Sequence, residues 1–428
     1  MPPADTHRAI DAVWRIESPR LIAGLTRIVR DVGLAEDLAQ DALVAALQQW
    51  PESGVPENPG AWLMATAKHR AMDHFRRSTR LDRKHGEIAR QLEAQEMAVP
   101  DVAAALDDNV GDDLLRLVFI SCHPVLSTEA RVALTLRLLG GLTTDEIARA
   151  FLVPEPTIAQ RIVRAKRTLA EKHVPFEVPR GAEMAARLSS VLEVIYLIFN
   201  EGYSATAGEE WLRPALCEDA LRLGRILDGL VPNEPEVHGL VALMEIQASR
   251  SKARVDASGA PILLPDQDRG RWDQLLIHRG LAALDSAAKL GAERGPYVLQ
   301  AEIAACHARA GAPEQTDWER IVALYAELAR IAPSPIVELN RAVAVAMAFG
   351  PQAGLELVDA LAPEPALRGY HLLPSVRGDL LKRLGRLREA RTEFERAAAL
   401  TRNLRERELL LARSRACAED NTPVPRPS

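Results

Sequence analysis

Residues 142–169 read LTTDEIARAFLVPEPTIAQRIVRAKRTL, and this stretch predicts two helices joined by a short turn. Thr144 is expected to cap the first helix, and Pro156 suits the first turn of the second. The second helix repeats apolar residues at spacings of four, three and four, so one face is expected to pack inward. This apolar face consists of Ile158, Ile162, Ala165 and Leu169.

The other side of the second helix is basic. Gln160, Arg161, Arg164 and Arg167 lie mostly off the apolar face. Such a helix can enter a DNA major groove, with its first turns near base edges and its later arginines near phosphates. The stretch alone also fits a structural helical hairpin with a solvated basic face, so the rest of the chain has to distinguish the two.

Composition predicts an all-α chain of more than one domain. The 428 residues are 47% hydrophobic but only 4% aromatic, and Ala, Leu and Arg are abundant. The net charge of −6 means that any surface for nucleic acid must be local. The four cysteines are far apart, which indicates reduced thiols and argues against structural zinc or disulfides. Neither a metal nor a cofactor is expected.

The sequence also predicts a cytoplasmic protein with no membrane partner. The N-terminus is polar and no apolar signal segment follows it. The longest apolar run, residues 191–199, is too short to span a bilayer and predicts a buried core helix.

Charge is distributed unevenly along the first 172 residues. Residues 68–90 hold eight basic and three acidic side chains, and residues 161–172 hold five and one. Between them, residues 91–113 hold seven acids and no base. Two basic patches joined by an acidic linker predict two contact sites on one polyanion, although charge runs are also common on solvated helix faces.

Apolar spacing predicts further helices upstream. Residues 7–50 read as two or three helices with a break at Gly33, and a proline-rich loop, residues 51–59, leads to a helix over residues 61–77. The residues of this last helix that are available to a core are Trp62, Leu63, Ala67, Ala71 and Phe75. Trp62 is expected to pack in the core rather than to stack on a base. Residues 114–139 are also expected to be helical, with a helix start near Ser127.

The order of these segments resembles a group IV, extracytoplasmic-function RNA polymerase sigma factor. AEDLAQD at residues 35–41 resembles region 2.2; WL at 62–63, AKHR at 67–70 and DHFRR at 73–77 resemble regions 2.3 and 2.4; residues 142–169 resemble region 4.2. Each motif is weak alone, but the three occur in the family's order and spacing. The sequence departs from the family where His69 replaces a common Asn and Pro156 replaces a common Gly.

The resemblance implies a non-catalytic subunit whose partners are core RNA polymerase and promoter DNA. It implies that the polymerase is contacted by Asp37, Gln40 and Asp41. It implies that the −10 element is contacted by Trp62, Lys68, Arg70, Asp73, Arg76 and Arg77. It implies that the −35 element is contacted by Thr157, Gln160, Arg161, Arg164, Lys166 and Arg167.

The remaining residues are expected to form a helical, tetratricopeptide-like domain. Residues 377–397 fit one repeat well, and two weaker copies precede it. This part resembles the C-terminal extension of a sigma subgroup, in which NEGY at 200–203 and DQDR at 266–269, followed by Trp272, look like signatures. The extension is interpreted as a regulatory module that contacts regions 2 and 4, the polymerase or another protein.

The predicted domains are therefore region 2 at 1–90, an acidic linker at 91–113, region 4 at 114–174 and a helical regulatory domain at 181–420. A second hypothesis is a helix-turn-helix transcriptional regulator with a helical sensing domain, which leaves the region 2 motifs unexplained. An enzyme in the C-terminal domain is a third, weak hypothesis, because the sequence has no nucleophile elbow, phosphate loop, HExxH or zinc spacing.

Overall fold

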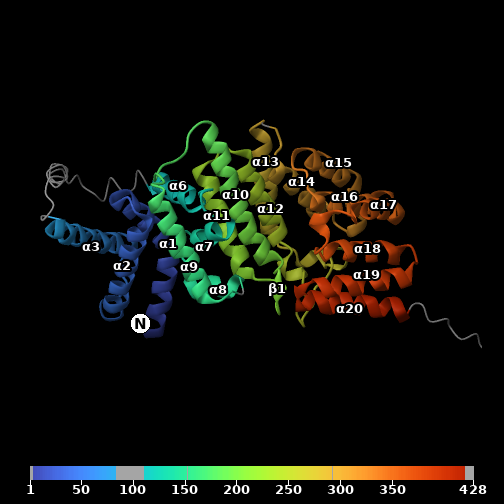
Figure 1. Cartoon of the computed structure of the whole chain (residues 1–428), viewed down its shortest axis with the longest axis horizontal. Helices are drawn as coiled ribbons and strands as arrows, with labels where there is room; N and C mark the ends of the chain where they lie inside the picture. The colour runs from blue at the N-terminus through green and yellow to red at the C-terminus, as the bar shows by residue number, and fades with distance from the viewer. Residues whose placement is uncertain (1–2, 83–109, 152, 292, 420–428) are drawn as a thin grey trace, which may run out of the picture. The chain divides into compact units, whose positions relative to one another are not determined.

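The computed structural model describes residues 3–82, 110–151, 153–291 and 293–419. The predicted all-α class is confirmed: helix follows helix, and the described strands are two pairs of residues (Figure 1). The chain packs as two compact units, residues 1–195 and 196–428, and the division falls inside one helix. Most of the predicted linker, residues 91–109, and the end of the first basic patch lie outside the described residues.

The first unit consists of seven helices among the described residues and the first half of an eighth. They are α1 (Pro3–Val29), α2 (Val32–Ser53), α3 (Pro59–Asp82), α6 (Val110–Ser121), α7 (Thr128–Leu138), α8 (Thr144–Phe151), α9 (Glu155–Glu171) and α10 (Ala182–Tyr203). Helix α2 packs against α1 and α3, and its Trp50 side chain is buried with Leu63 of α3. These contacts hold α3 against α2.

Two predicted boundaries in this unit are wrong. The first break lies at Arg30 and Asp31 rather than Gly33, because the Asp31 carboxylate accepts a hydrogen bond from the backbone nitrogen of Leu34 at 2.8 Å and so starts α2 one turn earlier. The loop expected from Pro51 begins at Gly54, since α2 continues through Pro51 and ends where Gly54, with φ of 83°, donates to Trp50.

Helices α8 and α9 form the predicted helix-turn-helix, and α7 precedes them. Ser127 caps α7 as expected, through a 3.4 Å hydrogen bond from Ala130. The cap of α8 is Thr143 rather than Thr144. Its hydroxyl accepts from the nitrogen of Glu146 at 3.2 Å, while the Glu146 carboxylate accepts from the nitrogen of Thr143 at 2.8 Å. This reciprocal pair is a capping box, which depends on a threonine and a glutamate three residues apart.

The second unit continues with short helices joined by tight turns. They are α11 (Pro214–Leu230), α12 (Pro235–Ala248), α13 (Gln274–Lys289), α14 (Pro296–Arg309), α15 (Trp318–Ile331), α16 (Pro335–Phe349), α17 (Pro351–Leu361), α18 (Leu372–Arg383), α19 (Leu387–Leu400) and α20 (Leu404–Glu419). Single 3-10 turns occur at Ser251–Ala253, Leu264–Asp266, Arg269–Arg271, Pro313–Gln315 and Pro365–Leu367. Strands β1 (Ala207–Gly208) and β2 (Arg402–Asn403) pair in parallel and join the two ends of this unit.

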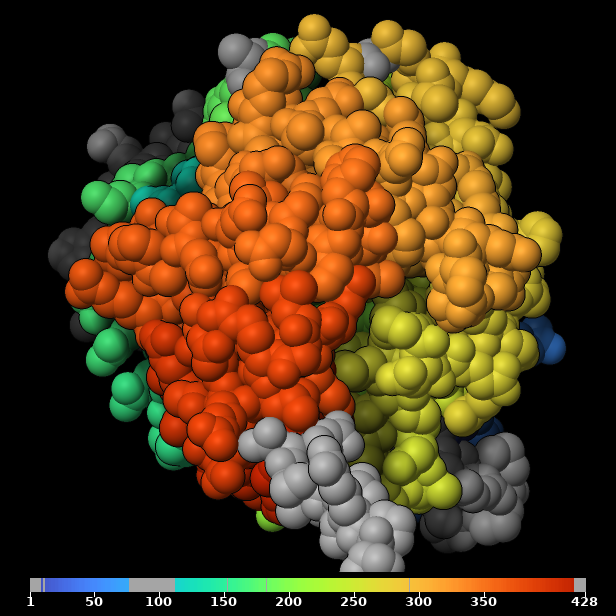
Figure 2. Space-filling view, turned by 90° about the vertical axis from the view of Figure 1, so that its right-hand side faces the viewer, coloured from blue at the N-terminus to red at the C-terminus, as the bar shows by residue number. Residues whose placement is uncertain are grey.

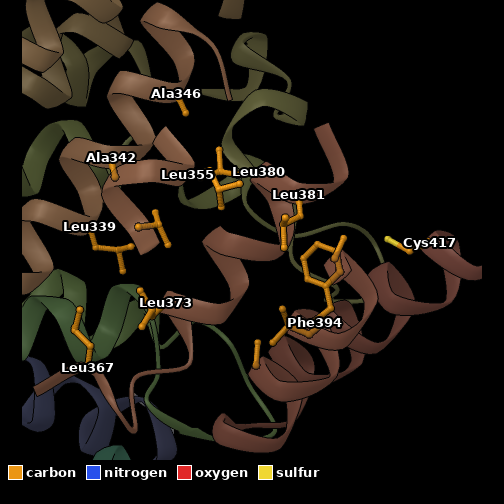
Figure 3. Packing of buried hydrophobic residues seen from close by; sticks show 14 of the residues in the cluster. Leu339, Ala342, Ala346, Leu355, Leu367, Leu373, Leu380, Leu381, Phe394 and Cys417 are labelled. Atoms are coloured by element: carbon orange, nitrogen blue, oxygen red, sulfur yellow. The ribbon is translucent and has the colours of Figure 1, made fainter. Parts of the chain in front are cut away.

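Consecutive helices of the second unit pack closely because small residues lie where they meet. A Cβ atom on Gly378 of α18 would lie 2.9 Å from the Phe394 ring of α19, and one on Gly354 of α17 would overlap the side chain of Ala346 on α16. Figure 3 shows the shared core of these helices, with Phe394 beside Leu381 and Cys417. Their outer surface is the orange and red part of Figure 2. The helical hairpins are present, while tetratricopeptide-like repeats remain a prediction.

In the described ranges, no helix combines the length and the hydropathy that a bilayer crossing requires.

Candidate nucleic-acid interface

Helix α9 has the two faces that its sequence predicts. Ile158, Ile162, Ala165 and Leu169 are all buried against the other helices of the unit. Gln160, Arg164 and Arg167 are exposed, and Thr157 and Arg161 are half-buried. Arg167 is paired with Glu171 one turn on at 2.6 Å. The exposed face therefore presents an amide and guanidinium groups from the first turn of the helix to its end.

Lys166 differs from the other predicted −35 contacts. Its side chain is only 18% exposed, and its ammonium is ion-paired with the carboxylate of Glu36 on α2. In this structure Lys166 therefore faces region 2 rather than solvent.

Val163 belongs to the exposed face of α9 but was not a predicted contact. Its side chain is 63% exposed, between Gln160 and Arg164 on the helix surface. An apolar side chain among groove-facing polar ones can contact the methyl group of thymine. The sequence could have indicated this residue, because Val163 is an apolar residue at a position outside the buried stripe of residues 158, 162, 165 and 169.

Helix α3 supplies the second predicted surface. Leu63, Ala67 and Ala71 are buried, so the opposite side of the helix is free for other contacts. Trp62 is half-buried, and its ring meets the buried ring of Trp50 edge-on with centroids 5.3 Å apart. That contact holds Trp62 near the start of α3 with part of its surface exposed.

The charged residues of α3 form a polar strip. Burial, with Arg27 nearby, lowers the pKa of Lys68. Arg70 pairs with Asp41 of α2 at 3.4 Å, and Asp73 lies 4.0 Å from Arg76. Both pairs are exposed, so their net stabilisation is small and their groups can exchange partners. The side chain of Arg77 lies outside the described residues.

Phe75 is not in the core as its spacing predicted. It is 42% exposed, and the neighbouring Met72 is 45% exposed. The stripe of α3 that packs on α2 is already filled by smaller residues, and Phe75 lies beyond it. Unpaired bases stack on aromatic side chains that lie beside basic ones, so Phe75 joins the candidate −10 surface.

The predicted polymerase-binding residues lie on one side of α2. Asp37 and Asp41 are exposed, while Gln40 is half-buried and donates a 2.6 Å hydrogen bond to Oε1 of Glu36. Asp41 also pairs with Arg70, so this acidic surface borders the candidate −10 surface.

Glu36 itself is buried, with a side chain 3% exposed. Its Oε1 lies 2.6 Å from Nε of Arg137 on α7, and its Oε2 pairs with Lys166 on α9. Burial opposes ionisation, but the charges of Lys166 and Arg137 outweigh it and lower the pKa of Glu36. The motif that marks α2 thus also fixes the position of α9.

The two unexplained motifs of the second unit meet in one cluster. The guanidinium of Arg254 lies over the Tyr203 ring, 3.5 Å from its centroid, and donates to the Tyr203 carbonyl at the end of α10. Arg269 lies 4.8 Å from the centroid of the buried Trp272 ring and donates to the carbonyls of His307 and Ala310 at the end of α14. Both arginines therefore satisfy helix carbonyls that would otherwise lack donors.

Arg250 connects the two halves of this cluster. Its guanidinium carbon lies 5.9 Å from the Tyr203 centroid and 5.8 Å from the Trp272 centroid. An ion pair in the NEGY motif joins Glu201 to Arg213. The contacts give both motifs a structural role: they hold the segment between α12 and α13 against the helix ends.

Comparison with known proteins agrees with this geometry. Residues 14–81 match the family Sigma-70 region 2, and residues 116–169 match Sigma-70, region 4. Residues 187–288 match a family of unknown function, DUF6596, which covers both motifs of the cluster. No solved structure matches the chain.

Several curated proteins are similar to parts of the chain. The probable ECF RNA polymerase sigma factor SigI of Mycobacterium tuberculosis is 27% identical over 40% of this chain and 58% of its own length. The ECF RNA polymerase sigma factor BldN of Streptomyces coelicolor is 32% identical over 32% of this chain and 49% of its own. The chain thus spans about half the length of these sigma factors.

Helix α3 thus belongs to the part of the first unit that matches Sigma-70 region 2, and α9 to the part that matches Sigma-70, region 4. Over almost its whole length this chain belongs to one family with the uncharacterized protein R00370 of Rhizobium meliloti, to which it is 46% identical over 93% of both chains.

Proposed function

We propose that this protein is an initiation subunit that binds core RNA polymerase, recognises promoter −10 and −35 elements and starts transcription. The observation that carries the proposal is that α3 and α9 each bury an apolar stripe and present a polar face, on regions 2 and 4 in the family's order. Such a subunit forms no covalent bond with DNA and acts where the polymerase acts, in the cytoplasm.

Each surface has a distinct task under this proposal. Thr157, Gln160, Arg161 and Arg164 read base edges, where one bidentate pair discriminates by about 1–3 kcal/mol. The strip on α3 tracks the backbone of the opened −10 strand with Lys68, Arg70, Arg76 and Arg77. Unstacking a base costs a few kcal/mol, which stacking on Trp62 or Phe75 offsets.

The polymerase contact is the acidic side of α2. Asp37 and Asp41 are exposed there, and Gln40 lies between them along the helix. A basic surface on the polymerase would complement these carboxylates and orient the encounter.

We further propose that residues 196–428 are a tetratricopeptide-like module that sets the activity of regions 2 and 4, through an intramolecular contact or a protein partner. One support is a compact helical unit in which successive helices share buried hydrophobic clusters. The other is that the chain matches R00370 over 93% of its length.

The test is in vitro transcription with core polymerase, comparing the full chain with a chain ending at Tyr203. This end point keeps α10, whose first half is bonded to the first unit through Arg131 with Glu193 at 3.1 Å and Arg187 with the Phe119 carbonyl at 2.9 Å. Promoter-dependent transcripts from the full chain support the initiation role. Identical output from both chains refutes the regulatory role of the second unit.

A helix-turn-helix regulator with a helical sensing domain is the second candidate. It accounts for α8, α9 and the C-terminal helices but gives α2 and α3 no task. Copurification with core polymerase distinguishes the two, because a regulator of this kind does not need the polymerase face of α2. Asp37→Lys should abolish copurification if that face binds the enzyme, and Glu52→Lys, on the same helix, should not.

A further inference from the structure

Three arginines gather around the rings of Tyr203 and Trp272 in the second unit. Arg250 and Arg254 are 8% and 6% exposed, and Arg269 is half-buried. Across the described ranges, none of the three is ion-paired with an acid. Their hydrogen bonds end on neutral groups, namely the amide of Gln247, the hydroxyl of Thr316 and the backbone carbonyls of residues 203, 307 and 310. Three positive charges are therefore buried together without a compensating negative charge.

The neighbouring groups respond to this positive charge. Burial lowers the pKa of His307 to about 4, and the charges of Arg250 and Arg269 contribute to the shift. Burial also lowers the pKa of Arg254, and the charge of Arg250 adds to that effect. Glu314 acts on Arg269 in the opposite direction, but burial and the charge of Arg250 outweigh it. The local potential is therefore positive, and an anion placed here would be stabilised by it.

Three buried N–H donors of this cluster lack an acceptor within the described residues. They are Nε of Arg250, Nε of Arg269 and Nε1 of Trp272. The guanidinium carbon of Arg250 lies 5.8 Å from the centroid of the Trp272 ring, and that of Arg269 lies 4.8 Å from it, so the donors surround one ring. Oε1 of Gln267, in the same segment, is buried and also unpartnered, so none of these donors bonds to it. Guanidinium and indole groups can only donate, and an unpaired buried donor costs free energy, so the cluster requires oxygens from elsewhere.

The charge of the cluster selects the class of anion. A carboxylate carries a single negative charge, whereas a phosphate group carries about −1.5 to −2 and offers three acceptor oxygens. Arg250 and Arg269 share the Trp272 ring, and Arg254 shares the Tyr203 ring with Arg250, so more than one positive charge faces the same place. Guanidinium groups match phosphate oxygens in geometry. Because the rings already hold the arginines, binding orders few further side chains.

We propose that Arg250, Arg269 and Trp272 bind a phosphate group, supplied by inorganic phosphate or by a small phosphomonoester. The two Nε–H groups and the indole N–H donate to its oxygens, and Arg254 adds to the attraction. The ligand binds the folded second unit only and therefore stabilises it. The inference does not depend on the initiation role, because every residue of the site lies within residues 196–428.

The experiment is a calorimetric titration of the full-length protein with sodium phosphate, starting in a buffer free of phosphate. The wild type should bind phosphate at one site. Arg250→Gln should weaken binding about tenfold, the loss expected for one charge-assisted hydrogen bond. Trp272→Phe keeps an aromatic ring and removes only the indole N–H, so it should fold normally and weaken binding several-fold. Arg271→Gln, at an exposed arginine of the same segment, is the matched control and should bind as the wild type does.

The His307 ring gives a second readout, which a purely structural role of the arginines would not change. Bound phosphate should raise the pKa of His307 in an NMR titration, because its negative charge offsets Arg250 and Arg269. The His307→Phe variant identifies the signal.

Titrations with glycerol phosphate and with acetate identify the ligand. Tighter binding of glycerol phosphate than of phosphate supports a phosphomonoester, and equal or weaker binding supports inorganic phosphate. Acetate binding as tightly as phosphate would refute a phosphate site. The proposal is also overturned if neither phosphate compound binds the wild type at millimolar concentration, or if Arg250→Gln and Trp272→Phe both bind phosphate as tightly as the wild type.

Discussion

The guanidinium carbon of Arg254 lies 3.5 Å from the centroid of the Tyr203 ring, and the same guanidinium donates to the Tyr203 carbonyl. One side chain thus binds the last residue of α10 by its ring and by its backbone. The same guanidinium carbon lies 4.5 Å from the centroid of the Trp211 ring. Three contacts at one buried cation make this residue a determinant of how the second unit holds together.

We predict that Arg254→Ala lowers the free energy of unfolding of the second unit by about 2 kcal/mol, the scale of a desolvated cation–π contact. Tyr203→Leu should act in the same direction and Tyr203→Phe should change little, since the ring remains. Arg271→Ala, at an exposed arginine of the same segment, is the control. Urea denaturation followed by circular dichroism measures all four, and an unchanged midpoint for Arg254→Ala would refute the role.

Arg164 and Arg167 should affect DNA binding differently. Arg164 is exposed near the middle of α9, so Arg164→Ala should cost about 1–3 kcal/mol at one base position and relax the preference there. Arg167 lies a turn nearer the end and is already paired with Glu171. Arg167→Ala should weaken binding equally for all sequences and reduce the salt slope by about one. Anisotropy titrations against a set of single-base variants separate the two outcomes.

Val163 should matter for DNA and not for folding. With 63% of its side chain exposed, Val163→Ser should change the unfolding free energy by less than about 0.5 kcal/mol. If Val163 contacts a thymine methyl, replacing that thymine by uracil should weaken wild-type binding but not binding by Val163→Ser. Equal losses for both proteins would show that the side chain makes no such contact.

Because α18 and α19 pack closely, we predict that replacing Gly378 by a larger residue destabilises the protein. Alanine there places a methyl group 2.9 Å from the Phe394 ring, and overpacking of this kind costs about 1–3 kcal/mol. The double variant Gly378→Ala with Phe394→Leu should recover part of the loss, because the smaller side chain vacates the space. Gly369→Ala, with no neighbouring atom within 4 Å of its Cβ position, should be neutral in thermal melts.

Acid should destabilise the second unit through His307. Burial, with the charges of Arg250 and Arg269, lowers the pKa of His307 to about 4. Its ordinary pKa is about 6.5, so between these values the unfolded chain binds a proton that the folded chain does not. Stability is therefore full above pH 6.5 and falls as the pH drops toward 4.

His307→Phe, which keeps an aromatic ring against Trp318, should flatten this dependence in melts of the second unit. His123 of the first unit also has its pKa lowered to about 4, chiefly by burial, so His123→Phe is the control that acts on the other unit. A His307→Phe protein that still loses stability over the same pH range as the wild type would contradict the assignment.

The sequence determined the local structure of this protein to a large extent. The spacing of Ile158, Ile162 and Leu169 defined the buried face of α9, because a helix brings residues three and four apart onto one side. Ser127 started α7 as predicted. The regions matched by Sigma-70 regions 2 and 4 follow the motifs found in the sequence. The individual contacts with polymerase and promoter remain predictions.

Only the tertiary structure decided which side chains lose their access to solvent. Glu36 has the sequence neighbours of an exposed acid. It can be buried because Arg137 and Lys166, which are more than a hundred residues away in the chain, bring two positive charges to it. Phe75 has the spacing of a core residue, but it lies beyond the contact of α3 with α2. Local periodicity fixes a helix and its faces, whereas burial depends on what packs on each face, and that is set by contacts between residues far apart in the chain.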